Sequence, residues 1–519
     1  MKTLFRRILT GWILAFGLTG GYWGMAMRPI NRWAMYFSHL DFWALLFLTL
    51  AEGTLLGLGA FALERVFPRA KPLLSATFFG WLAIVAANNF PELHKVLAAR
   101  MGCKWLTGPV WWVVVWTVGA CGIAGTLLFP SWRRGAARGW NLVRRLLWPV
   151  VFLVPLSLWR LPALDGACGK GLDFSPVPGN GEPPVVVLMF DMMGYGTLFG
   201  DGGQVVPACT NFAAFCGRAD VYHGAESAGG QTATSLPGFI VQERLATPSR
   251  KLRYAIGGWP FSDGTNTVYP ADFADRSLPA LARERGGRAQ AIGMYVPWDV
   301  IVPGLWDADE SIALGYGNHG VHVFGQAPSL RTAAAEHAAR YFLYASKSPA
   351  SALFRFAGLH DRTEARGYAE RTSLVARADR LLRESLSPGD FVFIHVDMPH
   401  DPYVVGRGGK PLPPALLFDN VAGLAAQTEG ADWALGTWLE AIASSPSGRD
   451  AWIIVTSDHN VHDPRFRKGA QKHVPFIVHR PGQTERHDVY GPADLTDLRH
   501  VLPDLPLFAG PPRTEQAGE

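Results

Sequence analysis

Cysteine is scarce in this sequence, and its placement excludes two common kinds of site. The 519 residues include 5 cysteines, and no two of them form a Cys-x-x-Cys pair. Thiolate zinc sites use such pairs, and a disulfide framework needs a dense, even set of cysteines. A Cys209–Cys216 bridge can be drawn, but the odd Cys168 argues against a framework. We therefore expect buried or incidental thiols.

A large excess of charge of one sign is also missing. The chain has 48 Lys and Arg residues against 43 Asp and Glu residues, a net charge of +5. Part of this excess lies in basic clusters beside long apolar runs. Basic clusters of this kind mark the cytoplasmic side of membrane spans, so the charge indicates membrane topology. No nucleic-acid partner is expected.

Apolar runs dominate the chain before about residue 160. Five segments approach the length that crosses a bilayer, which is about 20 residues. No small-residue cleavage site follows the first segment, so it is interpreted as an uncleaved anchor. The predicted spans are Ile8–Met27, Phe42–Leu63, Leu73–Phe90, Val110–Phe129 and Leu146–Trp159.

The basic residues predict the orientation of these spans. Because cytoplasmic loops carry the excess of Lys and Arg, the N-terminus is expected inside and the part after Arg160 outside. We therefore predict a membrane domain with five transmembrane helices over 1–160, a linker over 161–180 and an extracytoplasmic catalytic domain over 181–519. Five buried helices of a soluble protein are the alternative. The clusters that set the orientation are Lys2, Arg6 and Arg7; Arg65, Arg69 and Lys71; and Arg133, Arg134, Arg138, Arg144 and Arg145, with Lys95, Arg100 and Lys104 as an exception.

From about Gly181 onward, short β-rich runs alternate with helical patterns. Continuous apolar strands of this kind suit a sheet that helices cover on both faces, so a mostly parallel, doubly wound α/β domain is predicted. The expected strands are Val185–Phe190, Ala289–Tyr295, Phe391–Val396, Trp452–Thr456 and Pro475–Val478. The expected helices are Leu278–Arg285, Leu330–Ser346, Glu370–Leu386 and Ala422–Ser445.

Polar side chains follow several of these strands, where such a fold places its active site. Asp191 follows the first predicted strand, and Asp458 and His459 follow the fourth. Oxygen and nitrogen ligands together suit zinc or manganese. Taken singly, Asp191 and the Asp458-His459 pair are each better explained by a turn or a helix cap. The end of the third predicted strand carries another group, made of His395, Asp397 and His400.

The segment Gly229–Pro237, GGQTATSLP, leads into an apolar helical pattern. It puts a hydroxyl at a helix N-terminus, where free backbone N–H groups attract an anion. A metal beside that hydroxyl would lower its pKa and make it a nucleophile. An N-cap is the simpler alternative for one of these hydroxyls. Two further histidines, His400 in HVDMPHDPY and His473 in KHVPF, each precede a bend that contains proline.

Five motifs occur in this order along the chain: an Asp after a strand (Asp191), Gly-x-Thr-x-x-Ser-x-Pro, His-x-Pro-Tyr, Ser-Asp-His and His-Val-Pro. This order resembles that of the alkaline-phosphatase/sulfatase superfamily. Five spans ahead of an outside domain resemble the lipid A phosphoethanolamine transferases and the lipoteichoic acid synthases. The resemblance implies that Asp191, Thr232, Asp458 and His459 bind a metal, zinc first and manganese second. It also implies that Thr232 is the nucleophile rather than Thr234, because only Thr232 has the T-x-x-S-x-P spacing. His400 and His473 would then hold the substrate phosphate or a second metal.

Some positions depart from the family pattern. The C/S-x-P-x-R motif of sulfatases is missing at this place, and Asn460-Val461 stands where Gly-Glu is usual. Gly229 and Gly238 stand where phosphoethanolamine transferases have cysteines that brace the nucleophile loop. These departures leave the transferred group open.

The expected function is a phosphotransferase in the bacterial inner membrane with a periplasmic catalytic domain. A phospholipid such as phosphatidylethanolamine or phosphatidylglycerol would donate its head group through a covalent threonine intermediate. The acceptor would be an envelope glycolipid or glycan, and the protein is expected to be a monomer. A phosphatase- or sulfatase-type hydrolase and a non-catalytic, lipid-binding membrane regulator are the alternatives.

Overall fold

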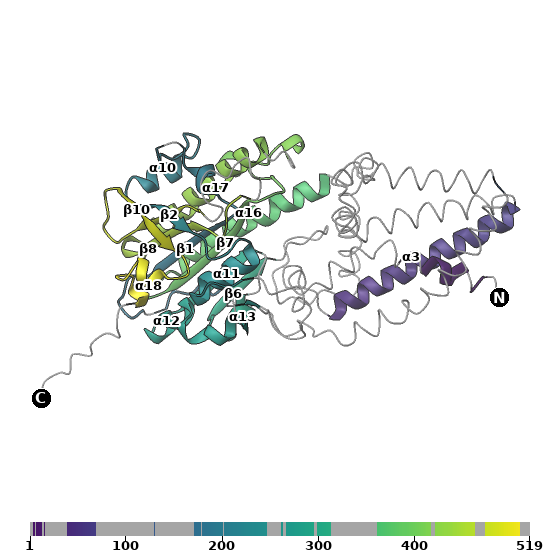
Figure 1. Cartoon of the computed structure of the whole chain (residues 1–519), viewed down its shortest axis with the longest axis horizontal. Coiled ribbons are helices and arrows are strands. Elements are labelled where there is room, and N and C mark those ends of the chain that lie inside the picture. The colour runs from purple at the N-terminus through teal and green to yellow at the C-terminus, as the bar shows by residue number, and fades with distance from the viewer. Residues whose placement is uncertain are drawn as a thin grey trace, which may run out of the picture. The chain divides into compact units, whose positions relative to one another are not determined.

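The computed structural model divides the chain into two compact units. The first comprises Met1–Arg28, Phe37–Ala163 and Pro328–Phe356, and the second comprises Pro29–Tyr36, Leu164–Ala327 and Ala357–Glu519. The structure describes residues 4–5, 7–12, 15, 39–68, 129, 171–177, 179–200, 202–246, 261–262, 266–294, 298–312, 361–416, 421–461 and 473–508. Figure 1 shows the helices and strands of these residues in colour.

In the first unit, the described residues contain one helix that could cross a membrane. Helix α3 spans His39–Val66 and covers the second predicted span. Its stretch Leu46–Val66 has 21 residues, a mean hydropathy of 1.8 and 22% of its apolar window buried. Length and composition are the only grounds for this assignment. The other four predicted spans lie wholly or mostly outside the described residues, so the multi-pass arrangement stays a prediction.

Glycines bring α3 close to the N-terminal helical segment 7–12. A Cβ atom added at Gly11 would lie 1.9 Å from the carbonyl oxygen of Gly53, and one at Gly57 would lie 2.6 Å from that of Arg7. Gly53 and Gly57 are four residues apart and therefore share one face of the helix. Small residues at this spacing are typical of helix pairs that pack inside membranes.

The second unit is built on an eight-stranded sheet with the order β10-β2-β9-β8-β1-β7-β5-β6. Strand β9 runs antiparallel to β2 and β8, while the other neighbouring pairs in this sheet are parallel. The strands are β1 Val185–Asp191, β2 Asp220–Glu226, β5 Ala289–Met294, β6 Ala308–Ile312, β7 Phe391–Pro399, β8 Trp452–Ser457, β9 Phe476–His479 and β10 His487–Asp494, and β3 Phe261–Ser262 with β4 Thr267–Val268 forms a separate ribbon.

The predicted α/β sheet is therefore confirmed in part: most neighbouring pairs are parallel, but β9 runs opposite to its neighbours. Chain that leaves β8 at its carboxyl end enters β9 at that same end of the sheet, because Thr456 pairs with Phe476. A strand that starts there can only run back, whereas a parallel strand needs a crossover to the other end. The predicted strand Pro475–Val478 is thus present as β9, with the direction opposite to its neighbours.

Helices cover both faces of the sheet, and β1 is buried along its whole length. On one face, Val186, Leu188 and Phe190 of β1 share a core with Phe212 and Trp438. On the other face, the alternate residues of β1 share a core with the helices that follow β2 and surround β5. The helices of this unit are α9 Tyr195–Leu198, α10 Thr210–Cys216, α11 Thr232–Val241, α12 Leu278–Glu284, α13 Trp298–Ile301, α16 Asp361–Glu384, α17 Ala422–Ser444 and α18 Leu498–Val501.

Three predicted helices correspond to α12, α16 and α17, and the fourth, Leu330–Ser346, lies outside the described residues. Cys209 and Cys216, at either end of α10, are buried free thiols, so the bridge between them is not formed. Burial raises the pKa of each thiol to about 12, which keeps both protonated and unreactive.

Candidate metal and nucleophile site

Three neighbouring parallel strands end together at the candidate site. Strand β1 lies between β7 and β8, with Met189 opposite His395 and Phe190 opposite Ser457. The backbone N–H of Asp458 donates to the carbonyl of Phe190 at 3.0 Å, which extends the ladder by one residue. The side chains of Asp191 and Asp458 thus emerge from adjacent strand ends, at the edge where parallel sheets carry their active sites.

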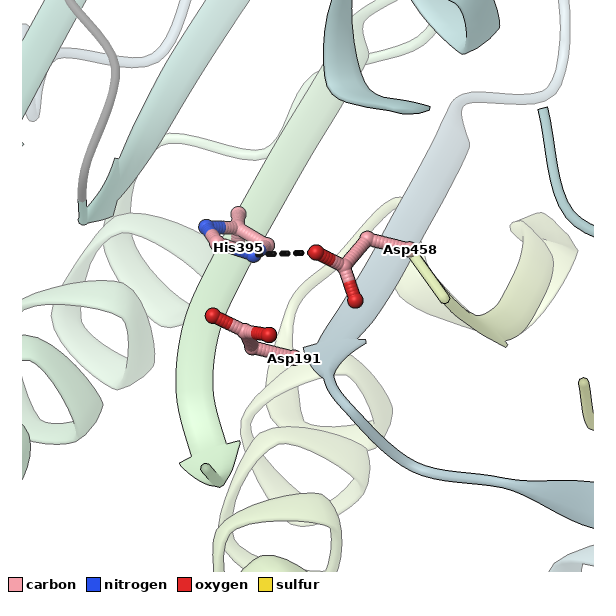
Figure 2. A group of neighbouring side chains, drawn as sticks. All are labelled: Asp191, His395 and Asp458. Carbon is pink, nitrogen blue, oxygen red and sulfur yellow. Dashed lines mark ion pairs between the residues drawn. The ribbon is translucent and has the colours of Figure 1, made fainter. Parts of the chain in front are cut away.

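Asp191, His395 and Asp458 form a buried cluster (Figure 2). Each offers one ligand atom, and these atoms lie within 4.8 Å of one another. The carbonyl of Met294 lies 3.1 Å from Nδ1 of His395, so the opposite ring nitrogen, Nε2, is directed at Asp458 Oδ2, 4.0 Å away. Neither Nε2 of His395 nor Oδ2 of Asp458 has a hydrogen-bond partner, although both residues are fully buried.

His459 and Thr232 complete the arrangement. His459 Nε2 lies 3.3 Å from Asp191 Oδ1 and 3.5 Å from Asp458 Oδ2. The Thr232 hydroxyl lies 3.2 Å from that same nitrogen and 3.4 Å from Asp191 Oδ1. The four residues predicted from the sequence as metal ligands are therefore close together, although they are separated by as many as 268 positions along the chain.

Backbone N–H groups around Asp458 bond to one of its oxygens and leave the other without a hydrogen bond. Its Oδ1 accepts from the N–H groups of Met192 at 3.0 Å and His459 at 2.6 Å. Met192 has a φ of 63°, a left-handed conformation that non-glycine residues rarely adopt. The strained turn after Asp191 therefore supplies a hydrogen bond that orients Asp458 and turns its Oδ2 toward His395.

The hydrogen bonds at the start of α11 distinguish Thr232 from the two neighbouring hydroxyl residues, Thr234 and Ser235. Thr232 is the first residue of the helix, whereas the Thr234 hydroxyl donates to the carbonyl of Gln231 at 3.0 Å. The Ser235 hydroxyl donates to the carbonyl of Asp458 and so connects the start of α11 to the turn that carries Asp458 and His459. Of these three hydroxyls, only that of Thr232 contacts Asp191 and His459.

Electrostatics at the cluster favour a cation. Burial raises the pKa of Asp458, and the nearby charge of Asp191 raises it further. Burial acts to lower the pKa of His459, but Asp458 and Asp191 outweigh it and raise that pKa to about 9. Burial also acts to raise the pKa of Asp191, yet the positive charges of His400 and His459 lower it overall. Two buried carboxylates this close repel each other, and a bound cation relieves that repulsion.

The donor set fits a transition metal. Two carboxylates, two imidazoles and a hydroxyl converge on one buried place, which suits zinc or manganese better than calcium or magnesium. The unpartnered nitrogen of His395 and oxygen of Asp458 are the two atoms that such an ion would satisfy. The residues present therefore fit a metal.

The two remaining predicted residues are placed differently. His400 follows β7, is about a third exposed, and its Nδ1 lies 2.6 Å from the carbonyl of Asp401. Against the effect of burial, its positive charge lowers the pKa of Asp191. His473 is half-buried, and its backbone accepts from the N–H of Tyr195 at 3.3 Å and bridges to Glu226.

His395 is the residue of this cluster to which the sequence assigned no role. The sequence places it with Asp397 and His400 among the polar residues at the end of the third predicted strand. Its approach to the other ligands depends on the position of that strand beside β1 and on their register, which no local pattern in the sequence indicates.

Comparisons with known proteins gave matches among solved structures alone. No family model matches the chain, and no curated protein does. A protein in the alkaline phosphatase superfamily from Vibrio parahaemolyticus is 13% identical, with 64% of this chain and 71% of that chain covered and a TM-score of 0.38. The phosphonate monoester hydrolase of Agrobacterium radiobacter is 12% identical, with 61% and 72% covered and a TM-score of 0.37.

A third match is the C-terminal periplasmic domain of EptC from Escherichia coli in a complex with Zn. It is 11% identical, with 66% of this chain and 86% of that chain covered and a TM-score of 0.36. The matched proteins include members of the superfamily that the sequence motifs resemble. Likenesses at these scores carry no conclusion about activity, which has to follow from the geometry of the site.

Proposed function

We propose that this protein is a metal-dependent phosphotransferase that carries the transferred group on Thr232. The observation that supports this most is the position of the Thr232 hydroxyl. It lies at the start of a helix, 3.2 Å from His459 Nε2 and 3.4 Å from Asp191 Oδ1, in a buried place. A hydroxyl that is held beside an imidazole and a carboxylate, at a helix N-terminus, is arranged as a nucleophile.

In the proposed reaction, Thr232 Oγ1 attacks the phosphorus of a phospholipid head group. The bond from phosphorus to the diacylglycerol oxygen breaks, and diacylglycerol leaves with a proton. An acceptor alcohol then attacks the same phosphorus, the bond from phosphorus to Thr232 Oγ1 breaks, and the proton of the acceptor passes to that oxygen. Asp191, whose two carboxylate oxygens lie 3.4 and 3.5 Å from the Thr232 hydroxyl, is within reach of its proton at the start of this cycle.

Asp191, Thr232, Asp458 and His459 would hold the metal, and the structure adds His395 to this proposal. A bound zinc or manganese ion would lower the pKa of the hydroxyl and neutralise charge that develops on the phosphoryl oxygens. His400 and His473 would contact the phosphate. The donor would be phosphatidylethanolamine or phosphatidylglycerol, and the acceptor an envelope glycolipid or glycan.

The membrane part of the proposal is supported by α3 alone among the described residues. A protein that is anchored by this helix and its predicted companions would keep the site at the bilayer surface, where donor and acceptor lipids both occur. Placement of the second unit in the periplasm follows from the basic clusters of the sequence.

Trapping of the covalent intermediate tests the proposal. Zinc-loaded full chain would be mixed with vesicles that contain phosphatidylethanolamine and phosphatidylglycerol, quenched in acid and mapped by peptide mass spectrometry. We expect the head-group phosphate on Thr232, diacylglycerol release from wild type, and neither in Thr232→Ala. Thr234→Ala is the matched control and should keep most of the activity, because its hydroxyl is turned toward Gln231.

Three outcomes would contradict this proposal in different ways. Phosphate on Thr234, or full activity in Thr232→Ala, would refute the assigned nucleophile. Release of the head-group phosphate into water, also when an acceptor alcohol is included in the vesicles and stays unmodified, would show a hydrolase. A wild type that binds the vesicles but never releases diacylglycerol would favour a non-catalytic membrane regulator.

A further inference from the structure

A buried ion pair holds the carboxyl end of β7, just outside the metal and nucleophile cluster. Arg371 of α16 lies with its guanidinium nitrogen 2.7 Å from Asp397 Oδ2, and the two side chains are 1% and 5% exposed. Exchange of a buried ion pair for apolar residues of similar volume is often neutral or stabilising. Stability alone therefore gives no reason for a charge at this place.

The contacts of Arg371 coincide with an irregularity in the strand. Val396 pairs with Phe190, but the next residue of β1, Asp191, pairs with Pro399. Two residues of β7, Asp397 and Met398, are thus skipped in the pairing opposite the first predicted metal ligand. Arg371 Nε donates to the carbonyl of Asp397 at 3.3 Å. The arginine therefore supplies a hydrogen bond at the bulge.

The same guanidinium reaches the residue that is proposed to contact phosphate. Arg371 donates to the carbonyl of His400 at 3.4 Å, and Gln427 of α17 donates to that carbonyl at 2.6 Å. The amide oxygen of Gln427 in turn accepts from the N–H groups of Val404 and Val405, at 2.6 and 3.1 Å. Both side chains are buried, so water cannot replace these hydrogen bonds readily.

We propose that Arg371 and Gln427 are positioning residues that fix His400 for its contact with a phosphoryl group. Each belongs to a different helix, and together they bond to the chain on both sides of His400 and at its own carbonyl. A site residue that is held this way keeps its geometry without reorganisation when substrate binds. The inference rests on the role proposed above for His400, and neither residue touches the substrate itself.

Two variants remove the hydrogen bonds with little change of volume. Gln427→Glu keeps an oxygen that accepts from Val404 and Val405 but loses the amide that donates to His400. Arg371→Lys keeps the charge beside Asp397 but loses the planar fork that serves several acceptors at once. Either change leaves the metal ligands themselves untouched.

A second buried arginine pair provides a matched control at the other end of β7. Arg288 lies 2.8 Å from Asp390, the residue before the strand, and the side chains are 11% and 3% exposed. It also donates to backbone carbonyls, those of Ser175 at 2.9 Å and Ser385 at 2.7 Å. Arg288→Lys should therefore lower the Tm much as Arg371→Lys does, without an effect on the site.

The experiment measures binding of inorganic phosphate to the zinc-loaded full chain by titration calorimetry. We expect Arg371→Lys and Gln427→Glu to raise the Kd roughly tenfold, the scale seen for residues that orient site ligands. His400→Ala should weaken binding at least as much, Arg288→Lys should leave it unchanged, and all variants should keep their zinc.

Unchanged affinity in Arg371→Lys and Gln427→Glu would overturn the inference, and so would unchanged affinity in His400→Ala. An equal loss in Arg288→Lys would overturn it too, because the effect would then be general loosening of the fold. Loss of zinc would also overturn the inference, because the two residues would then support the metal ligands and not His400. The measurement needs no turnover, so failure of covalent transfer to Thr232 in wild type is a separate result.

Discussion

Nε2 of His395 and Oδ2 of Asp458 face each other across 4.0 Å, and neither atom has a hydrogen-bond partner. Both side chains are fully buried. A buried polar atom without a partner costs about 1–3 kcal/mol, so two of them in opposition need an explanation. The separation is too long for a hydrogen bond and short enough for both atoms to contact one ion. We therefore expect His395 to be a metal ligand.

Replacement of His395 by Gln should weaken zinc binding by more than the 10–100-fold that loss of an outer-shell partner costs. Gln keeps much of the volume but removes the ring nitrogen that points at Asp458. Zinc affinity would be measured by competition with a chromogenic chelator. His479→Gln is the control, because this histidine packs on Phe215 and is away from the cluster. Equal zinc affinity in His395→Gln and wild type would remove His395 from the site.

Gly293 of β5 lies directly beside His395 in the neighbouring strand. It pairs with His395, and a Cβ atom there would lie 2.9 Å from the Cβ of His395 and 2.4 Å from the ring of Trp298. Overpacking of this kind costs about 1–3 kcal/mol. Gly293→Ala should therefore lower the unfolding free energy by about that amount in urea titrations and also weaken zinc binding, because His395 has to move.

The control for this change is Gly491→Ala on the edge strand β10, where an added Cβ would meet nothing within 4 Å. It should leave zinc affinity unchanged and alter stability far less. If Gly293→Ala lowered stability but left zinc binding as in wild type, His395 would not be a ligand that its neighbours position.

The ligands that sequence reasoning identified are those for which local signals were sufficient. Asp191 ends a run of apolar residues, and Asp458 and His459 directly follow strand β8. Parallel neighbours bring such strand ends to one edge, so their convergence follows from the fold class. His395 lies inside β7, before a bulge that the sequence does not reveal, and its direction toward Asp458 depends on that strand's register with β1.

The parts of the sheet that the sequence did not predict are those with weak or nonlocal signals. Strand β2 contains Asp, His, Gly and Glu, and β10 contains Gly491 and Pro492. Such residues are uncommon in strand interiors and are tolerated at an edge, which is where β10 lies. Pairing of β2 with β10 joins residues more than 260 positions apart, so no local pattern could indicate it.

The carboxylate of Asp220, at the start of β2, should make the unfolding free energy depend on pH. Burial acts to raise its pKa, but hydrogen bonds from Arg480 at 2.9 Å and Gln483 at 2.8 Å favour the carboxylate and lower that pKa overall. A lowered folded-state pKa adds stability above the unfolded value of about 4, and this is lost as the pH falls through the folded value. Asp220→Asn should therefore cost about 1.5–3 kcal/mol at pH 7. Urea titrations should show that the difference in unfolding free energy between Asp220→Asn and wild type shrinks toward about pH 3. A difference that stays constant with pH would mean that the charge of the carboxylate does not stabilise the fold.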